Sequence, residues 1–107
     1  RGSKLRAEIA FDAVPVLSAA LHLVQDGYAT GASDRNWSSM ASHVALPPGM
    51  PEWRKKLLCD PQTSGGLLVA CSRDSATAVL EIFRQQGFKH ACEIGRLAAG
   101  PVGITVS

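Results

Sequence analysis

The chain has 107 residues, which is enough for one domain, and its hydrophobic fraction of 46% is ordinary for a globular protein. Its net charge of +2 comes from scattered Lys and Arg residues, so it lacks the basic stripe of a nucleic-acid-binding protein. No apolar run approaches the roughly 18 residues that a membrane span requires. The one basic cluster, RKK at residues 54–56, is interpreted as a solvated helix face.

The first half of the chain predicts a strand, a helix and a long loop. Apolar residues alternate over residues 5–11, which is typical of a strand with one buried face. Pro15 suits the start of a helix whose apolar stripe runs to Val24, and Gly27 follows as its C-cap. Residues 28–50 are rich in Ser, Gly, Ala and Asn, have weak periodicity, and are predicted to form a functional loop.

The second half predicts two helices and three strands. A short helix is expected over residues 50–58, and a longer one, capped by Ser72 or Asp74, before Gly87. The run LLVAC at residues 67–71 is typical of a central strand that is covered on both faces.

The last two predicted strands cover residues 92–97 and 102–106, and we expect them to form a hairpin. The resulting order is strand, helix, loop, helix, strand, helix, strand, strand. It predicts an α+β fold (an α/β sandwich), with a mixed β-sheet and helices on one face. We expect a single domain over residues 1–107. Because the chain begins with Arg rather than Met, we also expect that residues precede it in the natural protein.

The cysteines indicate a reducing compartment. They lie far apart, without the paired spacing of a zinc site. Cys71 and Cys92 fall in apolar, strand-like segments, so we expect them to be small buried residues. The cytoplasm fits free cysteines and the lack of a secretory signal.

The loop DPQTSGG at residues 60–66 is the first candidate for ligand binding. Its proline fixes a turn, Thr63 and Ser64 offer hydroxyl groups, and Gly65 and Gly66 allow close backbone approach and positive φ. Successive backbone N–H groups can then form an anion site. It is not a Walker A loop, because a strand is predicted after it instead of a helix. From the residues alone, a turn without a ligand is the favoured interpretation.

The second candidate is TGASDRNW at residues 30–37. Arg35 can make bidentate hydrogen bonds to phosphate, Asn36 can donate and accept, and Asp34 could pair with Arg35 or reach a metal through water. An exposed polar loop is the equal alternative. The histidines share no metal-ligand spacing and are interpreted as structural or surface residues, and the tryptophans as packing anchors. These residues are His22, His43, His90, Trp37 and Trp53.

Two motifs resemble one known family. The stretch LLCDPQTSGGLLVA, residues 57–70, closely resembles the signature of the selenide, water dikinase (selenophosphate synthetase) family. GYATGASDRNWSS, residues 27–39, is similar to that family's Gly-x-x-Pro-Gly-Gly-Thr-x-Arg-Asn-Phe stretch, and its Arg-Asn pair matches as it stands. It departs from that pattern at Thr30, Ala32, Ser33 and Trp37. Residues 1–24 also look like a strand and helix of the family, so the resemblance covers essentially the whole chain.

The resemblance implies a C-terminal domain of the aminoimidazole-ribonucleotide-synthetase-like fold, truncated at its N-terminal side. The family makes selenophosphate from ATP, selenide and water and releases AMP and phosphate. Its nucleophile, its lysine and its magnesium ligands are expected upstream, so no catalytic or metal-binding residue is assigned in this chain. The full-length enzyme is then expected to use Mg²⁺ and ATP as a cytoplasmic homodimer, joined mainly through the missing domain. The fragment alone is expected to bind no cofactor and to be inactive.

The resemblance also implies that the two loops form one wall of an active site. The residues expected to bind substrate or phosphate are Arg35, Asn36, Thr63, Ser64, Gly65 and Gly66, and Asp60, Pro61 and Gln62 are expected to shape the loop. Three alternatives remain open. They are a related enzyme such as aminoimidazole ribonucleotide synthetase or thiamine-phosphate kinase, a stand-alone α+β binding or regulatory module, and a dimerisation domain that self-associates through an apolar sheet face.

Overall fold

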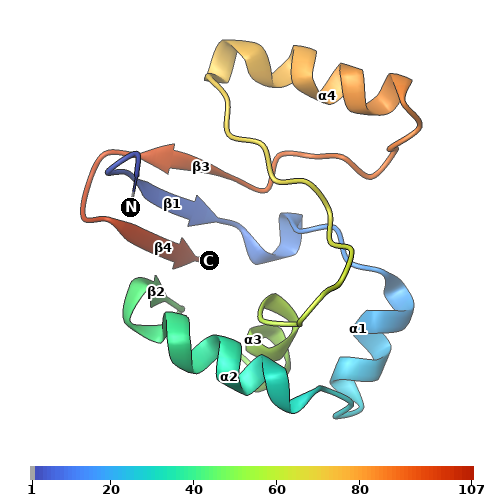
Figure 1. Cartoon of the computed structure of the whole chain (residues 1–107), viewed down its shortest axis with the longest axis vertical. Helices are drawn as coiled ribbons and strands as arrows, with labels where there is room; N and C mark the ends of the chain where they lie inside the picture. The colour runs from blue at the N-terminus through green and yellow to red at the C-terminus, as the bar shows by residue number, and fades with distance from the viewer. Residues whose placement is uncertain (1) are drawn as a thin grey trace.

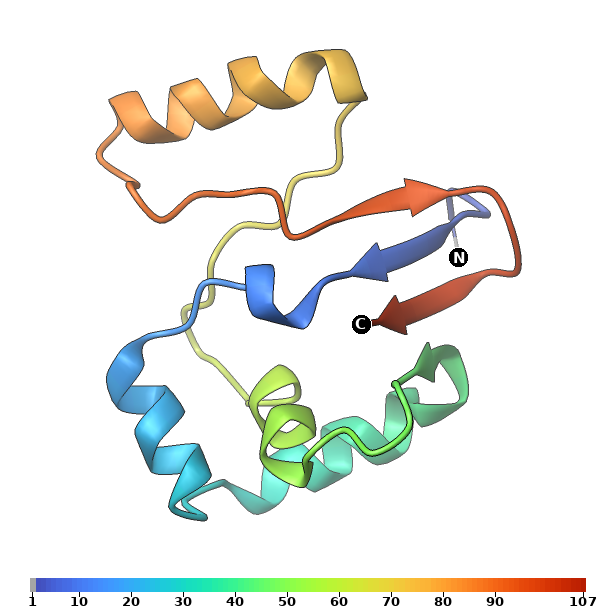
Figure 2. The ribbon, with the colours of Figure 1, turned by 180° about the vertical axis from the view of Figure 1, so that it is seen from behind.

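The computed structural model describes residues 2–107 and contains a mixed sheet of four strands, which confirms the predicted α+β fold. The strands are β1 (Arg6–Ile9), β2 (Val44–Ala45), β3 (Gly95–Ala98) and β4 (Gly103–Val106). Their order is β2-β4-β1-β3, in which β1 runs parallel to β4 and antiparallel to β3. The first three α-helices of the chain lie on the side of the sheet that β2 borders, and the last helix lies beyond β3 at the other edge (Figures 1 and 2).

The predicted hairpin of the last two strands is wrong, because β1 lies between β3 and β4. Alternating side chains identify a strand but not its neighbour, and β1 pairs on both sides. The connection between β3 and β4 therefore crosses the N-terminal end of β1. Gly100, which lies in this connection, has a φ of +142°. β3 also begins later than predicted, at Gly95. A Cβ on Gly95 would collide with the carbonyl of Glu8, so only glycine allows this close pairing.

The first strand ends two residues earlier than predicted, and its last apolar residue packs separately. Phe11 starts a 3₁₀ turn, η1 (Phe11–Ala13), and is buried together with Val24 and Val106. The backbone N–H of Phe11 donates to the carbonyl of Ser107 at 2.8 Å, which joins this turn to the end of β4. The small core therefore sits at the carboxyl ends of the parallel strands β1 and β4.

Three of the predicted helices form, although the first begins at Ser18 rather than at Pro15, and the N-cap of the last is Ser75 rather than Ser72 or Asp74. They are α1 (Ser18–Gln25), α3 (Glu52–Leu58) and α4 (Ala76–Gln85), the last preceded by the 3₁₀ turn η3 (Arg73–Ser75). Gly27 and Gly87 follow α1 and α4 with φ values of +92° and +89°, a left-handed conformation that suits a glycine C-cap. No helix within residues 2–107 is long and apolar enough to cross a membrane.

The long loop predicted over residues 28–50 is wrong. This part of the chain contains α2 (Gly31–Met40), the 3₁₀ turn η2 (Ala41–His43) and β2. On the side of α2 that faces the protein, Ser33 is buried and Trp37 is half-buried. The sequence therefore has no stripe of aliphatic residues from which the helix could be predicted. The hydroxyl groups of Ser38 and Ser39 donate to carbonyl oxygens of the preceding turn, so these polar side chains are satisfied within the helix.

The predicted central strand at residues 67–71 does not form, and the segment runs extended between α3 and η3. Leu67 and Leu68 are 84% and 77% exposed, because none of the strands in the described part of the chain lies beside them. The predicted burial of Cys71 and Cys92 is also wrong. Both are exposed, since Cys71 ends this unpaired segment and Cys92 precedes β3.

An ion-pair network crosses the sheet at Glu8. Glu8 and Arg96 are direct partners in the register of β1 and β3, and the Nε of Arg96 donates to the Glu8 carboxylate at 2.6 Å. Arg6 donates to the second carboxylate oxygen at 2.7 Å. The hydrogen bond from Arg96, and then that from Arg6, lowers the pKa of Glu8 below its ordinary value of 4.5.

Candidate functional site

Helix α3 positions the start of the DPQTSGG loop, and a stacked arginine attaches this helix to η1. The guanidinium carbon of Arg54 lies 4.4 Å from the ring centroid of Phe11 and 5.3 Å from that of Trp53. The two rings meet edge to face at 5.9 Å, which confirms Trp53 as a packing anchor. Arg54 also pairs with Asp12 at 3.1 Å. The arginine is therefore held mainly by aromatic contact, with an exposed carboxylate beside it.

The second side of α3 rests on α2. The Nζ of Lys55 lies 5.4 Å from the ring centroid of Trp37 and pairs with Glu52 at 2.8 Å. The interpretation of residues 54–56 as a solvated helix face is thus wrong, because all of them are half-buried. The local charge pattern could not predict this, because Phe11 and Trp37, which Arg54 and Lys55 contact, lie far away in the sequence.

A hydrogen bond joins the two candidate segments, of which residues 30–37 form the start of α2 rather than the expected loop. The side-chain amide of Asn36, on α2, donates to the backbone carbonyl of Cys59 at 2.9 Å. Cys59 is the C-cap of α3 and immediately precedes DPQTSGG. The structure thus brings Asn36 and the start of the DPQTSGG loop together, and the contact uses the side chain of Asn36 to hold backbone.

A depression of about 410 Å³ lies where these segments meet. Asp60 lines one side of it, and the turn between α1 and α2 lines the other, with Tyr28 and Thr30. This turn leads into the N-terminus of α2, where the helix dipole places partial positive charge. Sequence reasoning assigned Asp60 to loop shaping only, and it missed Tyr28, whose position beside the loop depends on the packing of α1 against α3.

The predicted binding residues 63–66 are exposed, and the backbone conformation of the two glycines differs from the one expected. Thr63 and Ser64 make no hydrogen bond through their hydroxyl groups to other residues of the 2–107 range. The expected positive φ at Gly65 and Gly66 is wrong, because neither adopts it. The backbone leaves the loop toward Leu67 in an extended conformation, which does not require a residue with positive φ. The side-chain oxygen of Gln62 lies 3.1 Å from where a Cβ on Gly65 would be, a contact that a small shift of this exposed side chain would relieve.

Arg35 stands on the exposed side of α2, one turn from its N-terminus. Its guanidinium lies 3.8 Å from where a Cβ on Gly31 would be, and no contact within the described residues joins it to residues 63–66. Burial raises the pKa of the Cys59 thiol, which the charge of Lys55 opposes. A thiol with a raised pKa is a poor nucleophile.

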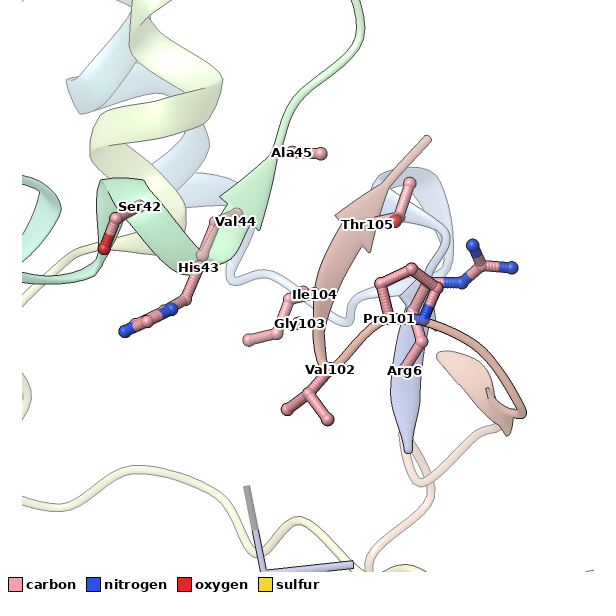
Figure 3. A pocket seen from close by; sticks show the side chains of 10 residues that line it. All are labelled: Arg6, Ser42, His43, Val44, Ala45, Pro101, Val102, Gly103, Ile104 and Thr105. Carbon is pink, nitrogen blue, oxygen red and sulfur yellow. The ribbon is translucent and has the colours of Figure 1, made fainter. Parts of the chain in front are cut away.

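The part of the chain that the structure describes offers no group of three His, Cys, Asp or Glu side chains that could hold a metal ion. A second depression, of about 300 Å³, lies between β2 and the start of β4 (Figure 3). Its His43 and Arg6 side chains point away from one another, so their nitrogen atoms do not converge on a ligand (Figure 3). The depression beside Asp60 is therefore the better candidate site.

Comparison with known proteins identifies the family of the chain. Residues 1–107 match the family described as AIR synthase related protein, C-terminal domain. The chain is 46% identical over 106 residues to the selenide, water dikinase of Rhizobium meliloti and 47% identical over 106 residues to that of Dechloromonas aromatica. It is 45% identical over 107 residues to that of Burkholderia pseudomallei. These matches cover 99–100% of the chain and 30% of each relative. The chain therefore belongs to the family of AIR synthase related proteins and carries their C-terminal domain.

Proposed function

We propose that the chain is the C-terminal part of a selenide, water dikinase, which makes selenophosphate from ATP, selenide and water and releases AMP and phosphate. The observation that carries this proposal is the 45–47% identity to proteins of that name over essentially the whole chain. Because the chain spans 30% of their length, the activity belongs to a longer polypeptide. This chain then supplies one wall of its active site and is inactive alone.

Phosphoryl transfer requires positive charge and tight positioning around the moving phosphate. We assign the positive charge on this wall to Arg35, next to the N-terminus of α2. The exposed hydroxyl and N–H groups of residues 63–66 donate hydrogen bonds to phosphate or substrate. The contact between Asn36 and Cys59, and Asp60 at the depression, support the proximity of the two loops.

Magnesium and ATP are the expected cofactor and nucleotide substrate of the longer enzyme. Magnesium, when bound, neutralises charge on the transferring phosphate. The described residues do not fit a magnesium site of their own, since no carboxylate cluster is present among them. We therefore place the metal ligands, and the nucleophile, outside this chain. The three free cysteines within residues 2–107 support a reducing, cytoplasmic location, and a homodimer through the N-terminal part remains part of the proposal.

Replacement of Arg35 tests the proposed wall. In the full-length enzyme, Arg35→Ala should lower kcat/KM for selenide-dependent AMP formation by roughly 10- to 100-fold, because a hydrogen bond to a charged group contributes about 1.5–3 kcal/mol. Arg84→Ala is the matched control, since Arg84 is an exposed arginine in the last turn of α4, outside both candidate segments, and its loss should leave kcat/KM unchanged. Equal kcat/KM values for Arg35→Ala and the wild type would contradict the site assignment.

A further inference from the structure

We propose that residues 67–71, LLVAC, are a docking strand that the N-terminal part of the longer polypeptide covers. The segment directly follows the candidate loop and is apolar throughout. Leu67, Leu68 and Val69 are 84%, 77% and 49% exposed. Three consecutive large apolar side chains in water are unfavourable, and such surfaces usually mark an interaction site.

The backbone of this segment is also without partners. Within residues 2–107, no backbone–backbone hydrogen bond involves residues 61–71, and no strand pairing includes them. An extended chain with unpaired N–H and C=O groups is a template for adding another strand. The apolar side chains and the open backbone therefore point to the same event, which is pairing within a sheet.

The partner must cover both faces of the segment as well as pair with its backbone. Successive side chains of an extended chain point to opposite faces, so Leu67 and Leu68 need cover on both sides. Helix α4 does not provide it, although it has an apolar stripe. It buries none of its residues, and Ile82 remains 61% exposed. Figure 1 shows the segment between α3 and α4 as a connection without helix or strand, which runs from the lower helices to α4.

The length of the relatives identifies the occupant. The chain spans 30% of them, and its family is described as a C-terminal domain, so the larger part of the polypeptide precedes it. The described residues bury three apolar side chains, which is a small core for a chain of this length. A second copy of the chain would offer the same unpaired segment and the exposed stripe of α4, and the dilution experiment below distinguishes it from the preceding polypeptide. The preceding polypeptide can supply both an edge and a covering layer.

The reactivity of Cys71 in the full-length protein tests this proposal, because Cys71 ends the docking strand and is exposed here. Iodoacetamide labelling would be followed by mass spectrometry in native buffer and in urea. We expect native labelling of Cys71 to be at least about tenfold slower than in urea, as for a site that reacts only after local opening. A native rate within about twofold of the unfolded rate would overturn the proposal. So would protection that disappears on dilution, which would identify a second copy as the cover.

A variant keeps the test independent of the proposed reaction. Leu68→Asp places a charge in the docking strand and should restore rapid labelling of Cys71. Gln86→Asp adds the same carboxylate at an exposed polar position after α4 and should leave the labelling rate unchanged. Unchanged protection in Leu68→Asp would overturn the proposal. Labelling needs neither ATP nor selenide, so its outcome is separate from any failure of the proposed enzymatic activity.

Discussion

Asn36 donates the hydrogen bond that links the two candidate loops, and this contact predicts a role in positioning. Asn36→Ala removes the donor to the Cys59 carbonyl. Because the pair is exposed, the loss should be about 0.5–1 kcal/mol, which corresponds to roughly two- to fivefold faster hydrogen exchange of the Cys59 and Asp60 amides, which donate to carbonyls of α3. Asn36→Asp should behave alike, because a carboxylate accepts hydrogen bonds but cannot donate them. The measurement uses the full-length protein without ligand.

A matched control separates positioning from ligand contact. Ser39→Ala removes a hydrogen bond within α2, to the carbonyl of Asn36, and should leave exchange of the Cys59 and Asp60 amides unchanged. If Asn36→Ala also left that exchange unchanged while lowering enzymatic activity, Asn36 would act by touching substrate, and the positioning role would be wrong.

Glu8 should make the sheet sensitive to acid. Its pKa is lowered in the folded chain, so its ion pairs stabilise the fold above the ordinary pKa, and this stabilisation is lost as the pH falls through the lowered value. Glu8→Gln should flatten the decrease of the thermal midpoint of the full-length protein below about pH 5. Glu93→Gln, at an exposed carboxylate outside this network, should retain the decrease. Equal pH profiles for Glu8→Gln and the wild type would contradict the assignment.

Helix α3 depends on one stacked side chain for its attachment to η1. Arg54→Ala removes contacts to two aromatic rings and should lower the free energy of unfolding by about 1–2 kcal/mol, measured from urea midpoints. Asp12→Ala removes only the ion pair with an 82% exposed carboxylate and should have an effect below about 1 kcal/mol. A larger loss for Asp12→Ala than for Arg54→Ala would show that the ion pair, and not the stacking, attaches the helix.

The helices show where sequence periodicity predicts an element and where it does not. The stripes of α1 and α4 and their terminal glycines predicted both helices, because each has apolar residues at helical spacing. Helix α2 was missed because its inward side holds a serine and a tryptophan rather than aliphatic residues. Residues 67–71 were predicted as a strand because their composition is that of one, yet pairing needs a neighbour that is missing from the described residues.

The sequence predicted which two segments belong to the candidate site, but it did not predict their conformations or how they lie relative to one another. The motifs selected Arg35, Asn36 and residues 60–66, and the structure brings Asn36 next to the start of that loop. The depression beside Asp60 could not be predicted, because it forms only when α1, α2 and α3 pack together. The functional assignment of the selected residues stays a prediction, since it rests on resemblance to longer proteins.

The proposed activity of the full-length protein is tested most directly by phosphorus NMR of a reaction with Mg²⁺, ATP, selenide and a reductant. The account predicts a selenide-dependent resonance of a phosphorus–selenium compound that grows together with AMP and phosphate. Conversion of ATP to ADP, or ATP turnover without any selenium-containing product, would contradict it. That outcome would favour another ATP-using member of the superfamily.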